Sequence, residues 1–130
     1  MNSAALLART FLGAVEWSAE LGSTNQRALE LGTQAVALPL RVGTSRQTRG
    51  RGRGSNTWWS TPGALTWSLL LEPAAFGILP PRWPALSLCA GTAVCLALQR
   101  WQLGDVRLKW PNDVFLNERK VCGILLESVP

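Results

Sequence analysis

Arginine alternates with glycine over residues 49–54, between Gln47 and Trp58, in the segment "QTRGRGRGSNTW". Glycine at every second position allows the backbone to approach a ligand closely and to turn its amides inward. Arg49, Arg51 and Arg53 can give charge-assisted hydrogen bonds to phosphate oxygens. The spacing fits neither the dinucleotide-binding pattern nor the P-loop pattern. Taken alone, the segment leaves three interpretations open: a phosphate site, an RGG-type nucleic-acid contact, or a solvated flexible loop.

A second candidate segment is "KWPND" at residues 109–113, followed by Lys120. A cation, a large ring, a rigid kink and two polar side chains fall together at a predicted strand end, where one ligand could meet several of them. Each residue also has an ordinary structural interpretation: Trp110 as core, Asn112 and Asp113 as turn formers, and Lys120 as a solvated hairpin side chain. The combination favours a ligand site.

Charge and cysteine content narrow the function classes. The formal net charge is +5, and 11 of the 13 basic residues are arginines, which favours forked recognition of phosphate or carboxylate by an anionic partner. The chain has three cysteines without a CxxC pair and has no histidine, which argues against a zinc site and a disulfide framework. We therefore expect a cytoplasmic protein, and the N-terminus shows no signal-peptide pattern.

Apolar periodicity and turn residues predict an α+β order of elements that would position the two segments. Ser23 can cap a helix that begins after it, Gly32 offers a left-handed stop, and Pro39 suggests an edge strand or a bulge. The uncharged stretch from Trp83 to Gln99 is too short and too polar for a membrane span, and it predicts a buried core helix. Strands are expected at 13–21, 35–45, 65–73, 106–110, 114–116 and 120–127, and helices at 23–32 and 84–103.

With both segments in view, the chain resembles the catalytic domain of biotin protein ligases, also called biotin–[acetyl-CoA carboxylase] ligases. Three matches carry the resemblance in the family's order: "STNQRA" from Ser23, "QTRGRGRGSNTW" from Gln47, and "KWPNDVFLNERKVCGILLES" from Lys109. The similarity covers about residues 15 to 128. It implies a fold related to class II aminoacyl-tRNA synthetases, with a mixed, mostly antiparallel sheet and flanking helices.

The resemblance also implies roles for individual residues. Ser23, Thr24 and Gln47 would bind biotin, because their hydroxyl and amide groups suit its ureido ring. Gly50 and Arg51 would close over biotin and its activated carboxyl.

Arg53 would meet phosphate and Trp58 would cap the pocket. Asn112 and Asp113 would face the phosphates of ATP, and Asp113 would hold Mg²⁺.

In the same comparison, Lys120 would bind the biotin carboxylate or the α-phosphate, and Gly123 would let the ligand lie against the strand. Arg51 and Lys120 are therefore the expected catalytic residues. The implied reaction joins biotin and ATP into biotinyl-5′-AMP and transfers biotin to a lysine of a biotin carboxyl carrier protein.

The chain departs from the family's pattern in three places. Asn56 replaces an arginine of the loop, so adenylate retention is expected to be weaker. The chain ends at Pro130, whereas the family continues with a glycine-rich strand and a small C-terminal β-barrel domain, so we expect residues 1–130 to be the N-terminal portion of the catalytic domain. An open sheet edge is then expected, which a homodimer could cover. Too few residues precede Ser23 for a DNA-binding domain, so no DNA binding is expected.

Two rival functions are kept. A lipoate- or octanoate-type ligase or transferase shares the fold and would prefer lipoate or octanoate over biotin. A basic, RGG-like nucleic-acid-binding module would use the loop arginines as phosphate contacts, and its affinity would fall steeply with salt.

Overall fold

The computed structural model describes residues 2–128. The described residues divide into two compact units, one formed by residues 2–72 with 127–128 and the other by residues 73–126.

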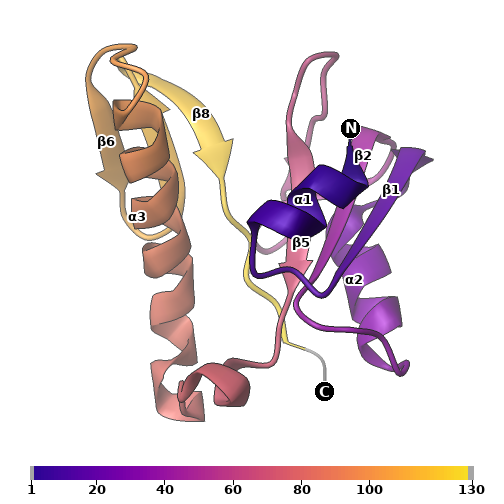
Figure 1. The fold of residues 1–130 in the computed structure, drawn as a ribbon. Coiled ribbons are helices and arrows are strands. Elements are labelled where there is room, and N and C mark those ends of the chain that lie inside the picture. Colours follow the sequence, from indigo (N-terminus) through magenta and orange to yellow (C-terminus); the bar gives the residue numbers. More distant parts are fainter. Residues whose placement is uncertain (1, 129–130) are drawn as a thin grey trace. The chain divides into compact units, whose positions relative to one another are not determined.

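The first unit is built on two parallel strands joined by a helix. β1 (Ala14–Leu21) pairs in parallel with β2 (Leu40–Gln47), and α2 (Thr24–Gly32) connects them (Figure 1). Parallel strands need such a crossover. The predicted N-cap is confirmed, because the Ser23 hydroxyl accepts a hydrogen bond from the backbone N–H of Gln26 at 3.4 Å.

The core of this unit lies between α2 and the sheet. β5 (Thr66–Leu70) pairs antiparallel with β2, so β2 is the central strand of the order β1-β2-β5. Val42 is fully buried, and it packs in the hydrophobic cluster that also contains Leu40, Ala28 and Leu31. Because side chains alternate along a strand, Arg41, which lies between Leu40 and Val42, points to the opposite face.

Two details of the predicted elements were wrong. β2 begins at Leu40 rather than at residue 35, and Pro39 precedes the strand after a cis Leu38–Pro39 peptide, so it marks neither an edge strand nor a bulge. α2 ends without a left-handed glycine, because Gly32 is its last helical residue and Thr33 follows with φ −89°. A proline lacks the N–H that a central strand donates, which explains its place before the strand.

The opposite face of the sheet carries a stacked arginine. The Arg41 guanidinium lies 5.9 Å from the ring centre of Trp17 and 5.6 Å from that of Trp67. Desolvation by burial lowers the pKa of Arg41. The aromatic rings occupy this face, whereas the hydrogen-bonded polar cluster described below lies on the α2 side.

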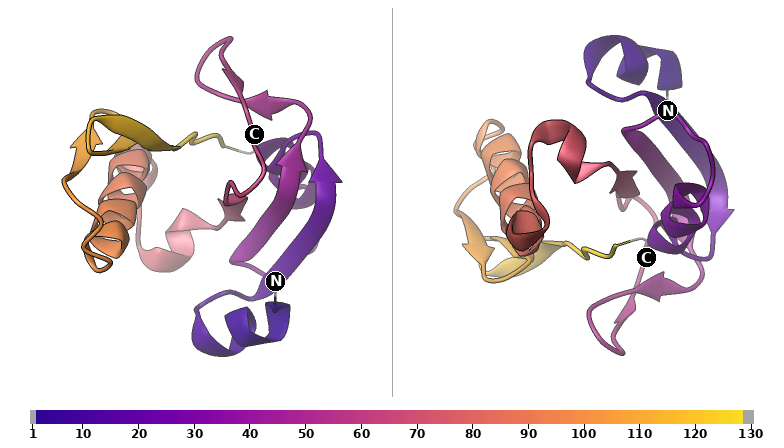
Figure 2. Two further views of the ribbon diagram at one scale, coloured as in Figure 1. Left: turned by 90° about the horizontal axis from the view of Figure 1, so that it is seen from above. Right: turned by 90° about the horizontal axis from the view of Figure 1, so that it is seen from below.

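The Arg/Gly segment, predicted as a loop, forms a small hairpin. β3 (Gly50–Arg51) pairs antiparallel with β4 (Thr57–Trp58), and the hairpin projects beyond the three-stranded sheet (Figure 2). Gly54 has φ +62°, a conformation that glycine adopts at low cost, and it lies in the turn between the two strands. A short helix, α1 (Ser3–Arg9), precedes β1.

The second unit packs one helix against a meander of three strands. Two 3₁₀ segments (Pro73–Phe76 and Pro80–Ala85) lead into α3 (Leu86–Gln99). The strands β6 (Val106–Lys109), β7 (Asp113–Leu116) and β8 (Arg119–Gly123) pair antiparallel in sequence order. A Cβ added at Gly91 of α3 would lie 2.6 Å from Leu108 Cδ1, so glycine permits the close approach of helix and strand.

The predicted turn at Asn117-Glu118 is confirmed. Both residues have positive φ, 47° and 64°, as a two-residue type I′ hairpin requires. The Asn117 carboxamide oxygen also accepts a hydrogen bond from the Asp105 N–H at 3.0 Å, which ties the turn to the start of β6.

Two predictions of burial in this unit were wrong. α3 was expected to be a buried helix over 84–103, but it is shorter, and Leu88 and Leu96 are 41% and 60% exposed. Gly91 and Cys95, one turn apart, are its buried residues, because a helix on a sheet buries one stripe. Trp110 is 79% exposed and is not a core residue. Within residues 2–128, no helix is both long and apolar enough to span a bilayer.

One ion pair of the first unit gives a pH-dependent prediction. Arg27 on α2 contacts both carboxylate oxygens of Glu16 on β1, at 2.7 and 2.9 Å, and these hydrogen bonds lower the pKa of Glu16 from its ordinary 4.5. A depressed folded-state pKa contributes stability above the unfolded pKa, and that stability is lost as pH falls through the folded value. We therefore expect Glu16→Gln to lower the urea midpoint at neutral pH.

The difference from the unsubstituted chain should shrink as the pH falls below 4.5 and through the lowered pKa of Glu16, because its carboxylate then becomes protonated in the folded state as well. Glu20→Gln, which removes the more exposed ion pair with Arg46, is the control and should change the midpoint less. A pH-independent loss in Glu16→Gln would contradict the assignment of the effect to this ion pair.

Candidate functional site

The N-terminal end of α2 lies beside the end of β2. The parallel pairing of the strands places Leu21 opposite Gln47. The backbone hydrogen bonding between the two segments continues past the ends of the strands. The Thr48 N–H donates to the Leu21 carbonyl at 2.9 Å, and the Arg49 N–H donates to the Gly22 carbonyl at 2.7 Å. The two motifs that begin at Ser23 and Gln47 therefore leave the sheet side by side.

Two hydrogen bonds from Thr24 fix the carboxamide of Gln47. Its Oε1 accepts from the Thr24 backbone N–H at 2.7 Å and from the Thr24 hydroxyl at 3.0 Å. A backbone N–H can only donate, so the amide oxygen must face Thr24 and the amide NH₂ must point elsewhere. The Nε2 atom lies 2.8 Å from where a Cβ of Gly50 would stand. The chain thus presents an oriented donor beside the Arg/Gly hairpin.

The same cluster continues through three residues that the sequence analysis did not select. The Ser68 hydroxyl of β5 lies 2.8 Å from the Thr24 hydroxyl and also within hydrogen-bonding distance of the Asn25 carboxamide oxygen. Because a hydroxyl carries one hydrogen, Ser68 donates to one of them at a time. Asn25 Nδ2 in turn donates to Glu127 Oε2 at 3.0 Å. Asn25 lies within the "STN" motif, whereas nothing in the local sequence marks Ser68.

Arg51 joins this cluster from the hairpin. Its Nη2 lies 2.6 Å from Glu127 Oε1, and its Nη1 donates to Gln26 Oε1 at 3.3 Å. A guanidinium has five N–H donors, so these contacts leave donors for an anionic ligand. Arg51 is half-exposed, as a cation that meets a soluble ligand must be.

The remaining residues predicted in this unit lie along the hairpin. Arg53 is exposed in the turn, and Trp58 is partly buried opposite Gly50. A groove of about 410 Å³ runs along the hairpin. Its lining residues are Thr48, Arg49, Gly50, Arg51, Gly52, Gly54, Ser55, Asn56 and Thr57. Two arginines, Arg49 and Arg51, therefore line this groove, and their positive charge suits an anion.

The second unit holds the other predicted residues, at the junction of β7 and β8. Asn112 holds the segment that follows β8 by two hydrogen bonds. Its Nδ2 donates to the Ile124 carbonyl at 2.8 Å, and the Ile124 N–H donates to the Asn112 carbonyl at 2.9 Å. Asp113 pairs with Gly123 in the β7–β8 register. Lys120 Nζ lies 2.7 Å from Asp113 Oδ2. Asn112, Asp113, Lys120 and Gly123 thus lie together at this junction, and their roles toward a ligand stay predictions.

Asp113 is the one acidic residue predicted to bind metal. Among the described residues, its Oδ1 is buried and accepts no hydrogen bond, which is costly for a carboxylate oxygen and fits an oxygen donor held for a cation. Residues 2–128 contain no group of three or more His, Cys, Asp or Glu side chains placed to hold a metal. A Mg²⁺ ion bound here would therefore take its other ligands from phosphate and water.

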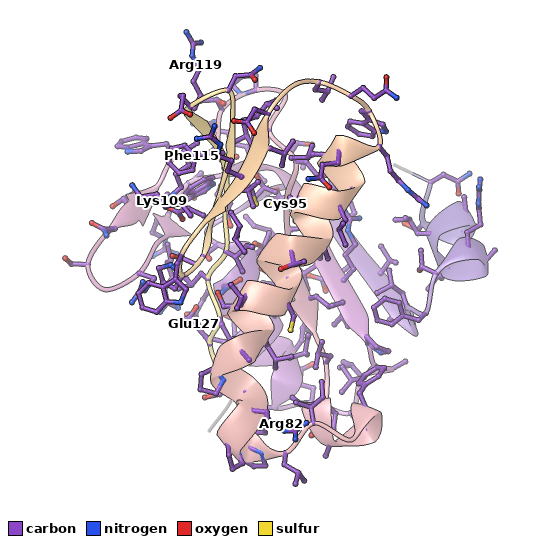
Figure 3. The ribbon with its side chains drawn as sticks, turned by 90° about the vertical axis from the view of Figure 1, so that its left-hand side faces the viewer. Arg82, Cys95, Lys109, Phe115, Arg119 and Glu127 are labelled. Carbon is purple, nitrogen blue, oxygen red and sulfur yellow. The ribbon has the colours of Figure 1, made fainter. Side chains whose placement is uncertain are left out.

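Two neighbours of this cluster, Cys122 and Lys109, have no predicted role in catalysis. Desolvation by burial, followed by the charge of Asp113, raises the pKa of the Cys122 thiol, so it stays protonated and unreactive at neutral pH. The Lys109 ammonium lies over the ring of Phe115, 5.3 Å from its centre (Figure 3). Lys120 is the lysine of this unit that lies against a carboxylate.

Comparison with known proteins decides the family. Residues 18–130 match the biotin/lipoate A/B protein ligase family. This chain belongs to that family. The fold predicted from the resemblance is confirmed by solved structures: the biotin protein ligase of Aquifex aeolicus in complex with biotin and ATP superposes with a TM-score of 0.73 at 37% identity, over 88% of this chain and 47% of that one.

Curated relatives of the biotin/lipoate ligase family agree. The bifunctional ligase/repressor BirA of Bacillus subtilis is 37% identical over 108 residues, 82% of this chain and 32% of the relative. The biotin–[acetyl-CoA-carboxylase] ligase of Paracoccus denitrificans is 37% identical over 114 residues, 85% of this chain and 45% of the relative. The chain therefore spans about a third to a half of the length of these relatives.

The close approach at Gly50 gives a prediction. A Cβ there would collide with the Trp58 carbonyl and with Gln47 Nε2. The Trp58 carbonyl belongs to the backbone of β4, the strand that pairs with β3 at Gly50, so it cannot move aside as a side chain could. We expect Gly50→Ala to cost about 1 to 3 kcal/mol of unfolding free energy, measured by urea denaturation.

Ser55→Ala, at an exposed position of the same hairpin, is the control and should stay within about 0.5 kcal/mol. Equal stability of Gly50→Ala and the unsubstituted chain would show that the hairpin does not close on Gln47 as described.

Proposed function

We propose that this chain carries the biotin-activating part of an ATP-dependent biotin–protein ligase. The observation that carries the proposal is the oriented carboxamide of Gln47, held by Thr24 beside Gly50 and Arg51, in a chain of the biotin/lipoate ligase family. A neutral donor next to a cation suits a ligand that has a polar ring at one end and a carboxylate at the other.

The first step would join two anions. A biotin carboxylate oxygen attacks the α-phosphorus of ATP, the bond to the β-phosphate oxygen breaks, and pyrophosphate leaves, so that biotinyl-5′-AMP forms. A carboxylic acid with a pKa of about 4 to 5 is ionised at neutral pH, so this step needs no general base. The absence of histidine from the chain therefore does not argue against it.

Positioning and charge would then supply the catalysis. Ser23 and Gln47 would bind biotin, Thr24 would contribute by orienting the Gln47 carboxamide, and Gly50 would let the hairpin close on the ligand. Arg51 and Lys120 would neutralise the carboxylate and the phosphate as they approach, an effect worth about 3 to 4 kcal/mol per well-placed donor.

The remaining predicted residues would handle the nucleotide. Arg53 and Asn112 would meet phosphate oxygens, Trp58 would cover the pocket, and Gly123 would leave room for the ligand along β8. Asp113 would hold Mg²⁺ through its buried Oδ1, and this ion, when bound, would offset negative charge on the phosphates.

In the second step the amine of a lysine on a carrier protein would attack the biotinyl carbonyl and release AMP. A biotin carboxyl carrier protein is the proposed acceptor, because a relative is named for the acetyl-CoA carboxylase that it serves. The family also includes lipoate ligases, so lipoate or octanoate is the alternative acyl substrate.

A half-reaction assay tests this function. The purified chain is incubated with Mg-ATP and either biotin or lipoate, and the quenched mixture is analysed by mass spectrometry. We expect biotinyl-5′-AMP, and we expect Lys120→Ala and Arg51→Ala each to slow its formation by about 100-fold or more.

Arg119→Ala provides a matched control for Lys120. Arg119 is the neighbour of Lys120 on β8 and points away from the strands into solvent (Figure 3), so its loss should leave the rate within about twofold. If lipoyl-AMP formed and biotinyl-AMP did not, the substrate would be lipoate and not biotin. Unchanged rates in both Lys120→Ala and Arg51→Ala would refute the catalytic assignment.

A further inference from the structure

Glu127 holds two parts of the first unit together through one carboxylate. Its Oε1 pairs with Arg51 Nη2 at 2.6 Å, and its Oε2 accepts from Asn25 Nδ2 at 3.0 Å. Glu127 follows β8 in the chain (Figure 3). Only 22% of its side chain is exposed. One side chain therefore links the Arg/Gly hairpin to the first turn of α2.

The link continues to the residues proposed to bind biotin. Asn25 and Thr24 share the Ser68 hydroxyl, and Thr24 orients the Gln47 carboxamide. Side chains within hydrogen-bonding distance of one another thus lead from Arg51 through Glu127, Asn25, Ser68 and Thr24 to Gln47, and the one Ser68 hydrogen is donated either to Asn25 or to Thr24. Networks of this kind hold each member in one orientation, because moving one leaves another unsatisfied.

Folding stability does not explain this arrangement well. Arg51 is 43% exposed, and ion pairs with one partner at that exposure contribute about 1 kcal/mol or less. An arginine side chain has many rotamers, and two anchors, Glu127 on Nη2 and Gln26 on Nη1, restrict it to one position. The remaining guanidinium donors then face a defined direction.

We propose that Glu127 is a positioning residue, which aims Arg51 at the reacting carboxylate and ties that aim to the orientation of Gln47. The kinetic part of this inference rests on the proposed function. Glutamate suits the task because its carboxylate offers two acceptors to two donors. A glutamine in its place would offer one acceptor, and its NH₂ would face a donor of Arg51 or Asn25.

Proteolysis tests the anchoring of Arg51 without any ligand. Trypsin must draw an arginine out of its contacts before it cleaves, so the initial cleavage rate at Arg51–Gly52 relative to Arg53–Gly54, read by mass spectrometry, reports how firmly Arg51 is held. We expect Glu127→Gln to raise this ratio about fivefold or more. Glu20→Gln, which breaks the ion pair with Arg46 in the same unit, should leave the ratio unchanged.

Kinetics of adenylate formation test the positioning itself. We expect Glu127→Gln to lower kcat about tenfold or more while KM for biotin changes less than about threefold, with the thermal midpoint near that of Glu20→Gln. Glu127→Asp keeps the charge but is one methylene shorter, so it should remain impaired.

Each outcome decides between explanations. A proteolysis ratio in Glu127→Gln equal to that of the unsubstituted chain would overturn the anchoring of Arg51. Full activity of Glu127→Asp would show that the charge, and not the position, matters. If the unsubstituted chain formed no adenylate, the proposed function would fail, and the proteolysis ratio would still decide whether Glu127 holds Arg51.

Discussion

The parallel pairing of β1 with β2 is the constraint on which the site in the first unit depends. It brings the residues after both strands to the same end of the sheet, and the ladder runs on through the backbone bonds from Thr48 to Leu21 and from Arg49 to Gly22. The start of α2 and the start of the Arg/Gly hairpin therefore lie side by side. The contact between Thr24 and Gln47 is the side-chain consequence of this backbone register.

The two arginines Arg51 and Arg53 of the hairpin differ in how they are held. Glycine is required at Gly50, where the strand touches Gln47 and the Trp58 carbonyl, and it eases the left-handed turn at Gly54. Arg51 is anchored by an acid, whereas Arg53 is exposed at the turn. A hairpin of this kind can present one fixed and one adaptable cation to a ligand that carries both a carboxylate and phosphates. In the second unit, Asp113 and Lys120 form a compact pair of opposite charges at the β7–β8 junction.

Short sequence patterns correctly predicted the helix cap and the hairpin turn. Ser23 as a helix cap and Asn117-Glu118 as a turn were predictable because caps and tight turns depend on a few adjacent residues. The contacts of Thr24 with Ser68 and of Arg51 with Glu127 were not predicted, because their partners lie 44 and 76 positions apart in the chain. Family motifs marked Thr24 and Arg51 individually, but they do not state which side chains hold them.

Burial was the least predictable property. An apolar helix such as α3 buries only the stripe that meets the strands, so composition overstated its burial and left Leu96 exposed. Trp110 is exposed although tryptophan is a large apolar residue, because a ring is buried only where another part of the protein packs against it. In contrast, the polar residues Ser23 and Thr24 at the start of α2 are buried, with Thr24 only 3% exposed, because each has a hydrogen-bond partner.

A double-mutant cycle on Thr24 and Gln47 tests the central claim most directly. Biotin affinity is measured by titration calorimetry for the unsubstituted chain, Thr24→Val, Gln47→Ala and the double variant; valine keeps the backbone N–H and the shape of threonine. If Thr24 acts by orienting Gln47, each single change should weaken binding about tenfold or more, and the double variant should bind about as weakly as the weaker single variant. Independent, additive losses would contradict the account, because Thr24 would then contact the ligand without acting through Gln47.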